Sequence, residues 1–371
     1  MQVLVERSEL LKATGRAQSV VERRNTIPIL QNLLMEAQDG SVSIKATDLD
    51  IEVVERLQGK ILKDGAVTVS AHMLHEIVRK LPEGAEVALT SEGDGRLTIS
   101  AGRSRFALAT LPKEDFPVMA SAEFTTTFTA NPAEIRRLFD KAKFAISTEE
   151  TRYYLNGVYF HLAEEGGAPR LRAVATDGHR LARIDAEPPS GAEGMADVIV
   201  PRKTVGELRK LLDDAQDAVE ISVSETKIRF ANETVVLTSK VIDGAFPDYS
   251  RVIPTGNTLK LSIEPDKFAK AVDRVATVSS ERTRAVKMNI EPGKLSLSVN
   301  SPDSGSASDE LEVTYQGDPI EIGFNSKYLL EIADQIDQEE AVFLFSDPNS
   351  PTLVREGDDT SAIYVVMPMR V

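Results

Sequence analysis

One pair of side chains has a spacing that suits acid–base chemistry. Asp177 and His179 lie two residues apart in the segment Ala175–Leu181, and such a pair can act as a general acid and base. The same segment also fits a strand, a tight Asp-Gly turn and a second strand with no catalytic role. No phosphate-binding loop, dinucleotide fingerprint or nucleophile elbow accompanies the pair in the sequence. We therefore favour the strand–turn–strand segment, whose turn could still shape a binding surface, with catalysis as the alternative.

The histidine and cysteine content speaks against a metal centre. His72 and His75 lie three residues apart on a predicted helix and could share one face. A zinc site needs at least a third ligand, and the neighbouring sequence offers none that is obvious. The chain contains no cysteine, which excludes disulfides and thiolate metal sites. The sequence therefore predicts neither a catalytic metal nor another cofactor.

Two other segments are typical of binding surfaces. Arg152–Gly157 places two tyrosines beside an arginine, and such side chains can stack on bases and contact phosphates. The alternative is that these tyrosines pack on the surface of a sheet. The last residues, Ile363–Val371, are apolar almost to the end, although chain ends usually fray. Tyr364–Val366 fits a final strand, and Pro368 disfavours further ladder pairing. Met367, Met369 and Arg370 are then candidates for a surface pocket.

Composition indicates a globular chain of two or three domains. The chain has 371 residues, of which 42% are hydrophobic and 27% charged, with a net charge of −15. No apolar run approaches the ~18–20 residues of a membrane span, and the first residues alternate like a strand rather than a signal peptide. These features predict a cytoplasmic protein with no membrane partner.

The charge is distributed unevenly along the chain. The candidate helices contain more Lys and Arg than Asp and Glu, while the rest of the chain is strongly acidic. Basic helices could contact DNA phosphates, or could reflect only the helix propensity of Lys and Arg on solvated faces. The candidate helices span 7–24, 72–80, 134–143, 202–210, 267–274 and 327–334.

The same sequence pattern occurs three times at domain-sized spacing. Val69–Ile77, Val200–Leu208 and Phe324–Ile332 each join an apolar strand end to a helix with an acidic residue followed by an aliphatic one. Phe116-Pro117 recurs as Phe246-Pro247. Three repeats, each with two helices and several short strands, predict an α+β fold of antiparallel sheets with helices on one face.

Particular residues set the expected ends of these elements. Ser8 is predicted to cap the first helix, and Asn131 the first helix of the second repeat. Arg103–Leu108 is expected to be an edge strand that could pair with a neighbouring domain. The Ser/Asp/Gly-rich stretch Asn300–Asp309 is expected to be a loop. Boundaries between repeats are expected near 120–122 and 254–257.

Six short segments resemble one family of bacterial proteins. They are Ile27–Leu34, Gly102–Phe106, Arg152–Gly157, Thr176–Leu181, Phe246–Tyr249 and Tyr364–Arg370. Together they closely resemble the bacterial DNA sliding clamps, the β subunits of the DNA polymerase III holoenzyme. The likeness runs the whole length of the chain.

The resemblance implies three clamp domains of the processivity fold, at 1–121, 122–255 and 256–371. It implies a head-to-tail homodimer, a ring with sheets outside and basic helices inside, through which double-stranded DNA passes regardless of sequence. Such a protein has no catalytic residues, metal or cofactor. Its implied partners are the polymerase alpha subunit, an ATP-driven clamp loader, and repair polymerases, mismatch-repair proteins and ligase. An acidic adaptor that binds peptides without encircling DNA is the alternative.

The resemblance also assigns roles to individual residues. A partner peptide of the Gln-x-x-Leu-Phe kind would bind between the second and third domains, at Leu155, Thr176, Gly178, His179, Arg180, Leu181, Pro247, Arg251, Val252, Asn325, Tyr328, Val365, Met367, Pro368, Met369 and Arg370. DNA contacts are implied for Arg24, Tyr153, Tyr154, Arg202 and Lys203. The implied dimer contacts are Phe106 and Leu108 with Thr277 and Val278.

Five positions depart from the family pattern. Thr283 stands where a phenylalanine is expected, and Asn349 and Pro351 stand where aliphatic and small residues are expected, so the wall of the peptide pocket should differ in shape. Glu149 and His72 stand where a glutamine and an arginine are expected. Both weaken the expected contact with phosphate at those two positions.

Overall fold

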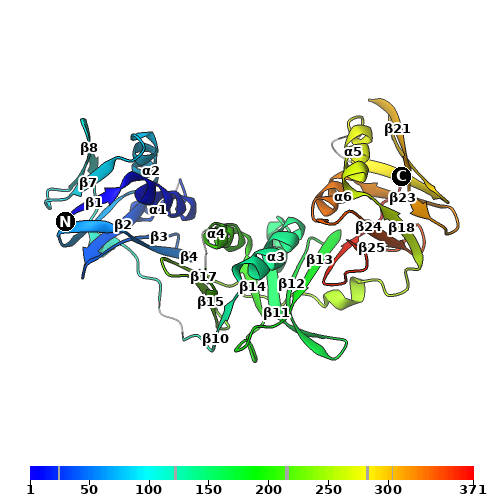
Figure 1. Cartoon of the computed structure of the whole chain (residues 1–371), viewed down its shortest axis with the longest axis horizontal. Helices are drawn as coiled ribbons and strands as arrows, with labels where there is room; N and C mark the ends of the chain where they lie inside the picture. The colour runs from blue at the N-terminus through cyan, green and yellow to red at the C-terminus, as the bar shows by residue number, and fades with distance from the viewer. Residues whose placement is uncertain (24–25, 121–122, 214–216, 281–283, 303) are drawn as a thin grey trace. The chain divides into compact units, whose positions relative to one another are not determined.

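The computed structural model divides into two compact units. It describes residues 1–23, 26–120, 123–213, 217–280, 284–302 and 304–371. The first unit contains Met1–Arg136 and Pro189–Ile242, and the second contains Arg137–Pro188 and Asp243–Val371 (Figure 1). The division passes through the middle repeat, so these units differ from the three repeats seen in the sequence. The domain limits 1–121, 122–255 and 256–371 remain a prediction, and residues 121–122 lie outside the described residues.

All six predicted helices are present. They are α1 (Arg7–Val20), α2 (Ala71–Lys80), α3 (Pro132–Ala142), α4 (Arg202–Asp213), α5 (Pro265–Ala276) and α6 (Ser326–Ala333). Helix α1 ends at Val20, the end expected for the first helix and four residues before the limit of the 7–24 range used for its charge, because Val21 already has an extended backbone. Single 3₁₀ turns are η1 (Pro28–Gln31), η2 (Lys113–Asp115), η3 (Lys143–Ala145), η4 (Glu150–Leu155) and η5 (Tyr249–Val252).

The helix caps partly follow the prediction. Asn131 caps α3 as expected, since its Oδ1 accepts the Ala133 N–H at 2.8 Å. The prediction that Ser8 caps α1 is wrong. Glu6 is the N-cap, and its carboxylate accepts the N–H of Ser8 at 2.9 Å. A carboxylate satisfies the first-turn donors as a hydroxyl would and also complements the helix dipole. The hydrogen bond from the Ser8 side chain is the main cause that lowers the pKa of Glu6.

The first unit contains two antiparallel sheets. One has the strand order β5 (Gly59–Lys63), β1 (Gln2–Glu6), β7 (Glu86–Thr90), β8 (Arg96–Ala101) and β9 (Ser104–Ala109). The other has the order β10 (Thr126–Ala130), β15 (Val219–Val223), β16 (Lys227–Ala231), β17 (Val235–Lys240), β4 (Ile51–Leu57), β3 (Ser41–Thr47), β2 (Asn32–Gln38) and β6 (Gly65–Ser70). The unit also includes the short strand β14 (Val198–Pro201). Strand β9 confirms the predicted edge strand.

The second unit is also built on antiparallel sheets. Its longer sheet runs in the order β11 (Gly157–Glu165), β12 (Ala168–Thr176), β13 (Arg180–Ala186), β26 (Ala362–Val366), β25 (Thr352–Glu356), β24 (Ala341–Phe345), β18 (Leu259–Ile263) and β22 (Thr314–Tyr315). The shorter sheet runs in the order β21 (Gly305–Glu312), β20 (Lys294–Ser301), β19 (Ala285–Glu291) and β23 (Ile320–Asn325).

The prediction of a loop at Asn300–Asp309 is wrong. This stretch belongs to the hairpin of β20 and β21, which pair from Lys294–Glu312 to Ser301–Gly305. The side chains of β21 alternate between exposed and half-buried positions. A strand at the edge of a sheet tolerates small and polar residues, and here that composition was mistaken for a loop.

Successive repeats join edge to edge, as predicted. In the first unit, β17 of the middle repeat pairs with β4 of the first repeat, with Leu237 opposite Val53 (Figure 1). In the second unit, β26 of the third repeat pairs with β13 of the middle repeat, with Leu181 opposite Val365. The same type of joint is therefore built twice along one chain.

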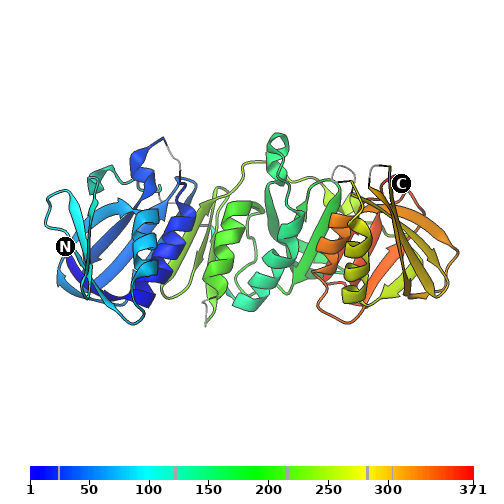
Figure 2. The same cartoon turned by 90° about the horizontal axis from the view of Figure 1, so that it is seen from above.

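Helices cover one face of these sheets and close the cores. Figure 2 shows α1 beside α2 and α5 beside α6. In the second unit, the predicted stripe of Phe268, Val272 and Val275 on α5 is buried, and the Phe268 ring lies 5.1 Å from that of Phe343. Among the described residues, no helix is long and apolar enough to cross a membrane.

Candidate functional site

The turn at Asp177 is held together by its own side chains. Thr176 Oγ1 donates to the Arg180 carbonyl at 2.7 Å and accepts the Gly178 N–H at 3.1 Å. Asp177 Oδ1 accepts the N–H groups of His179 and Arg180, at 2.9 and 3.0 Å. Gly178 has a φ of +88°, which disfavours any side chain. These contacts are those of a strand–turn–strand segment, as the sequence analysis favoured, with the Asp177 carboxylate used to close the turn.

Arg180 joins this turn to helix α6. Its guanidinium is almost fully buried, forms ion pairs with Asp177 and Glu331, and donates to the Phe144 carbonyl at 2.6 Å. It also lies over the Tyr328 ring, 4.4 Å from the centroid. A planar guanidinium suits both the ion pairs and the stacking. Arg180 is therefore placed to orient Tyr328, while its own donors are already engaged.

The ring of His179 lies beside that of Tyr328. The two centroids are 6.3 Å apart and the planes are inclined by 20°. Burial raises the pKa of the Tyr328 hydroxyl, and the nearby Asp177 carboxylate adds to that effect. The hydroxyl is therefore protonated at neutral pH, so the two rings offer a flat surface with a hydrogen-bonding edge.

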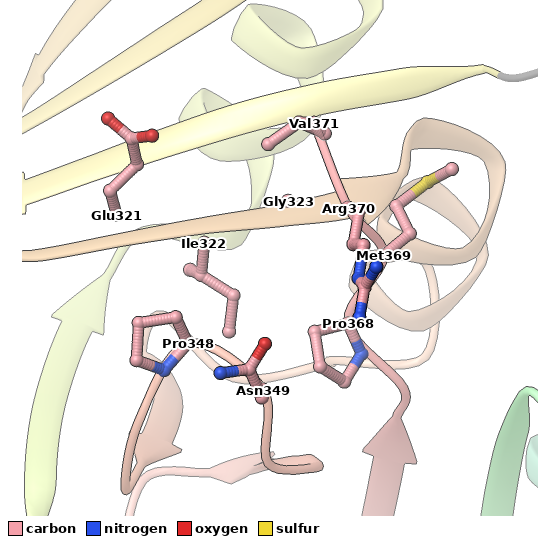
Figure 3. Close-up of a pocket in the computed structure, with 9 residues that line it drawn as sticks. All are labelled: Glu321, Ile322, Gly323, Pro348, Asn349, Pro368, Met369, Arg370 and Val371. Carbon is pink, nitrogen blue, oxygen red and sulfur yellow. The ribbon is translucent and has the colours of Figure 1, made fainter.

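The last residues of the chain, Met367–Val371, form a tail that is fixed at two points. Met367 N–H donates to the His179 carbonyl at 2.9 Å, and Met369 N–H donates to the Gly323 carbonyl at 2.9 Å. Figure 3 shows the pocket beside this tail. It is lined by Glu321, Ile322, Gly323, Pro348, Asn349, Pro368, Met369, Arg370 and Val371. Four residues named from the sequence, Asn349, Pro368, Met369 and Arg370, thus meet at one pocket.

An apolar cluster lies beneath the joint between β13 and β26. Leu181 and Val365 face each other across the two strands and are almost fully buried. They pack with Val174, and Phe246, Tyr249 and other half-buried side chains cover this cluster. Leu155 is also buried, while Val252 and Met367 are 45% and 39% exposed. Val252 and Met367 therefore leave apolar surface exposed, whereas Leu155, Leu181 and Val365 are buried.

The structure shows where the remaining residues assigned to the peptide site lie, but their contacts do not test a binding role. Pro247 is exposed and follows Phe246, whose ring stacks on Tyr159 with centroids 4.9 Å apart. Arg251 is exposed and forms an ion pair with Asp248 at 2.8 Å. Asn325 caps α6 through its Oδ1, which accepts the Lys327 N–H at 3.0 Å. Thr283 lies outside the described residues. The binding role of these residues remains a prediction.

Sequence reasoning missed two groups of residues. Gly323 was not singled out, although an isolated glycine in a strand often marks a close backbone approach. The second group fixes the segment after Phe246. Tyr249 Oη donates to His161 Nε2 at 3.1 Å and accepts from Arg172 Nη1 at 3.2 Å. Arg172 in turn pairs with the buried carboxylate of Asp185 at 2.6 Å. No local pattern in the sequence indicates this network, because its members come from three strands and the 3₁₀ turn η5, which are separated along the chain.

Comparison with known proteins identifies the family. The model of the N-terminal domain of the DNA polymerase III beta subunit matches residues 1–120, that of the central domain 129–248 and that of the C-terminal domain 250–370. The chain belongs to the DNA polymerase III beta subunit family. It is 54% identical to the beta sliding clamp of Caulobacter vibrioides and 38% identical to that of Escherichia coli, in each case over 100% of both chains.

Solved structures agree with this assignment. The sliding clamp of Bartonella birtlesii bound to griselimycin is 53% identical, with a TM-score of 0.97 and 100% of both chains covered. The sliding clamp of Pseudomonas aeruginosa bound to griselimycin is 37% identical, with a TM-score of 0.94 and the same coverage. The resemblance seen in the sequence is therefore confirmed, as is the α+β fold of repeated clamp domains.

The residues expected to contact DNA in this family differ in how they are placed. Tyr153 is 54% exposed and its ring meets the Tyr154 ring edge-on at 5.8 Å. Arg202 is exposed at the start of α4. The ammonium of Lys203, by contrast, forms an ion pair with Asp48 and donates to the Val20 carbonyl, at 2.5 and 2.7 Å. Lys203 therefore joins two repeats. Arg24 lies outside the described residues.

The expected dimer residues lie at free sheet edges and beside them. Phe106 and Leu108 are half-buried on the edge strand β9 in the first unit. Thr277 and Val278 directly follow α5 in the second unit, where Thr277 Oγ1 donates to the Asp273 carbonyl at 3.2 Å. Helix α5 packs against the edge strand β21. The structure thus places Phe106 and Leu108 on one edge strand, and Thr277 and Val278 directly after a helix that packs against another edge strand.

The two histidines of α2 connect that helix to α1. His72 Nε2 donates to the Val21 carbonyl at 3.2 Å, and His75 Nδ1 lies 3.2 Å from Thr14 Oγ1. Burial lowers the pKa of His75. Within the described ranges, no group of three histidine or acidic residues could hold a metal ion. The imidazoles therefore have structural partners in the helix pair.

Proposed function

We propose that this protein is a DNA polymerase processivity factor, which acts by binding and not by catalysis. Two copies form a ring around duplex DNA, slide along it and tether the replicative polymerase. The observation that supports this is membership of the beta subunit family over all three domains. Retention by enclosure needs no base-specific contact, which is compatible with a net charge of −15.

The repeat architecture supports closure by a second copy. The last strands of the three repeats, β9, β17 and β26, are of one type, and β4, β13 and β21 are of a second type. Each joint within the chain pairs one strand of each type: β17 with β4, and β26 with β13. Two strands of these types have no such partner in the described chain. They are β9 of the first repeat and β21 of the third, and both are sheet edges. A head-to-tail dimer pairs them and removes both exposed edges.

The internal joints also predict the register of this intermolecular pairing. Leu237 and Tyr364 occupy the position of Phe106, and they face Val53 and Ala182. The strand ladder of the third repeat can be followed outward from the N-cap of α6, as in the other two repeats from the N-cap of their second helix. It reaches Ala307 of β21 at the position of Val53 and Ala182. Phe106 is therefore expected to face Ala307 of the partner, with Leu108 opposite Gly305. Helix α5 packs against β21, so Thr277 and Val278, which follow α5, are proposed to contact Phe106 and Leu108 of the partner as well.

The absence of native cysteine makes this register directly testable. In the same register, Ala107 faces Ser306 of the partner, at a Cα separation that suits a disulfide. Ala107→Cys combined with Ser306→Cys should form covalent dimers on mild oxidation. Ala107→Cys combined with Ser308→Cys is the matched control and should cross-link poorly. Equal cross-linking of the two variants, or none of either, would contradict the register.

The proposed site for partner peptides lies between the second and third repeats and includes the pocket beside the tail, which we call the tail pocket. Its supports are the exposed Met367 and Val252, the His179–Tyr328 surface and the pocket beside Pro368 and Met369. The polymerase alpha subunit, the clamp loader, repair polymerases, mismatch-repair proteins and ligase are the proposed partners. Tyr153, Tyr154, Arg202, Lys203 and Arg24 are proposed to contact DNA, and Lys203 also holds the joint between two repeats.

Retention on DNA tests the function as a whole. The protein is loaded onto nicked circular DNA by a clamp loader with ATP, and one half of the sample is then linearised. We expect the clamp to stay on the circle and to leave the linear molecule, because topology alone holds it. An adaptor that only binds peptides would show no loader-dependent retention on circles. Equal retention on both DNA forms would refute enclosure.

A further inference from the structure

The tail crosses strand β23 at a residue that has no side chain. Met369 forms a bridge with Gly323, and its N–H donates to the Gly323 carbonyl at 2.9 Å. Gly323 is buried and pairs with Lys287 on its other side. In Figure 3 the tail runs across β23 near Gly323 and ends at Val371, on the far side of β23 from Pro368. Gly323 thus lies between a regular ladder and the end of the chain.

Space, not backbone conformation, explains the glycine. A Cβ atom at Gly323 would lie 2.3 Å from Val371 Cγ1 and 2.6 Å from the Met369 carbonyl oxygen. Real Cβ atoms do not approach other atoms so closely, so any side chain would push the tail off the strand. The φ angle of Gly323 is not in the left-handed region. The missing side chain is therefore what lets the tail lie flat.

The geometry points to Gly323 as a positioning residue for the partner site, an inference that rests on the proposed function of the tail pocket. The tail is fixed at His179 by Met367 and at Gly323 by Met369. Pro368 between them has no N–H to offer. With both ends fixed, Pro368 and Met369 are held against Pro348 and Asn349 on the opposite wall. Losing the Gly323 contact leaves the tail attached at one end and widens the pocket.

Gly323→Ala tests this role, with Gly256→Ala as the matched control. Gly256 lies in the same unit, has an ordinary φ and has no atom within 4 Å of an added Cβ. Two quantities are measured: hydrogen exchange of the Met369 amide, and binding of a fluorescent Gln-Ala-Ala-Leu-Phe peptide. Gly323→Ala should speed that exchange and weaken peptide binding by about fivefold or more, as for overpacking of a tight contact. Gly256→Ala should change neither.

A second variant separates positioning from general damage. Deleting Val371 in the Gly323→Ala background removes the two Val371 contacts and leaves the one with the Met369 oxygen. Peptide affinity should then recover in part, while a merely destabilised chain would not recover. Faster exchange at Met369 with unchanged peptide affinity would overturn the inference. If the wild-type chain binds no peptide, the proposed function fails, and unchanged exchange in Gly323→Ala would independently show that Gly323 does not hold the tail.

Discussion

Leu108→Asp should convert the dimer to single chains. The register derived from the internal joints places Leu108 opposite Gly305 of the partner, and the two-fold ring contains this contact twice. Leu108 is already half-buried in the single chain. We therefore take half of the usual value for burying a leucine, about 0.75–1.5 kcal/mol at each interface. The two interfaces together lose about 1.5–3 kcal/mol of burial.

The introduced carboxylate adds a second cost. It would be desolvated beside β21, an acidic strand that carries Asp309, Glu310 and Glu312. An unpaired polar group in such a place costs about 1–3 kcal/mol, and it also occurs twice. The total is at least about 3.5 kcal/mol, so the dissociation constant should rise by several hundredfold or more, at about 1.4 kcal/mol per tenfold.

Light scattering during size-exclusion chromatography measures the outcome. The single chain has a mass of 40.5 kDa, and the dimer has twice that. Leu62→Asp is the matched control, because Leu62 lies on β5, the opposite edge of the same sheet, and is 47% exposed. We expect a single-chain mass for Leu108→Asp and a dimer for Leu62→Asp. A dissociation constant of Leu108→Asp that equals the wild-type value in a dilution series, or equal dissociation of both variants, would refute the edge-pairing argument.

Three further outcomes are expected. Deleting 367–371 should abolish peptide and polymerase binding while light scattering still reports a dimer, because β26 ends at Val366 and stays paired. Asp48→Asn should lower the urea midpoint and Lys203→Gln should lower it by more, because Lys203→Gln leaves the mostly buried Asp48 carboxylate without its cation, whereas the Lys203 side chain is 38% exposed. Burial lowers the pKa of His75, so the unfolded chain binds more protons below about pH 6.5. Stability should therefore fall from pH 7.5 to 5.5, and His75→Gln should show a smaller fall in urea titrations.

Local and periodic features could be predicted from the sequence. The six helices follow from apolar stripes such as that of Phe268, Val272 and Val275, which are short-range patterns. The edge strand at Arg103–Leu108 follows from its alternation, since Phe106 and Leu108 share one face. The repeats could be recognised because the joint between a strand and the following helix needs the same residue types each time. Local chemistry decides each of these features, so a single sequence is sufficient.

Features that depend on distant partners could not be predicted. The family resemblance assigned Lys203 to DNA, and that role stays a prediction, but no sequence pattern indicated that Asp48, far away in the sequence, engages its ammonium at 2.5 Å. Ser8 was chosen as a cap by residue type, and the preceding Glu6 took that role. A glycine is needed at position 323 only because the tail, Met367–Val371, crosses β23 there. Tertiary contacts decided these three cases.

The two joints within the chain explain why only one of them carries the proposed pocket. Both contain the same turn: Thr47 Oγ1 donates to the Ile51 carbonyl at 2.8 Å, as Thr176 does to Arg180. In the first joint, the lysine of α4 engages the turn aspartate directly. In the second, Arg180 stands where the first joint has Ile51, and it reaches α6 through Glu331.

The two joints also differ at the end of their last strand, which is β17 in the first joint and β26 in the second. After β17 the chain continues into the next repeat, and Lys240 pairs with Asp50 of the first turn at 2.9 Å. After β26 the chain ends, and Met367 donates its N–H to the corresponding residue, His179. At this position the first joint therefore has the Lys240–Asp50 ion pair, whereas the second has Met367 and its exposed apolar surface.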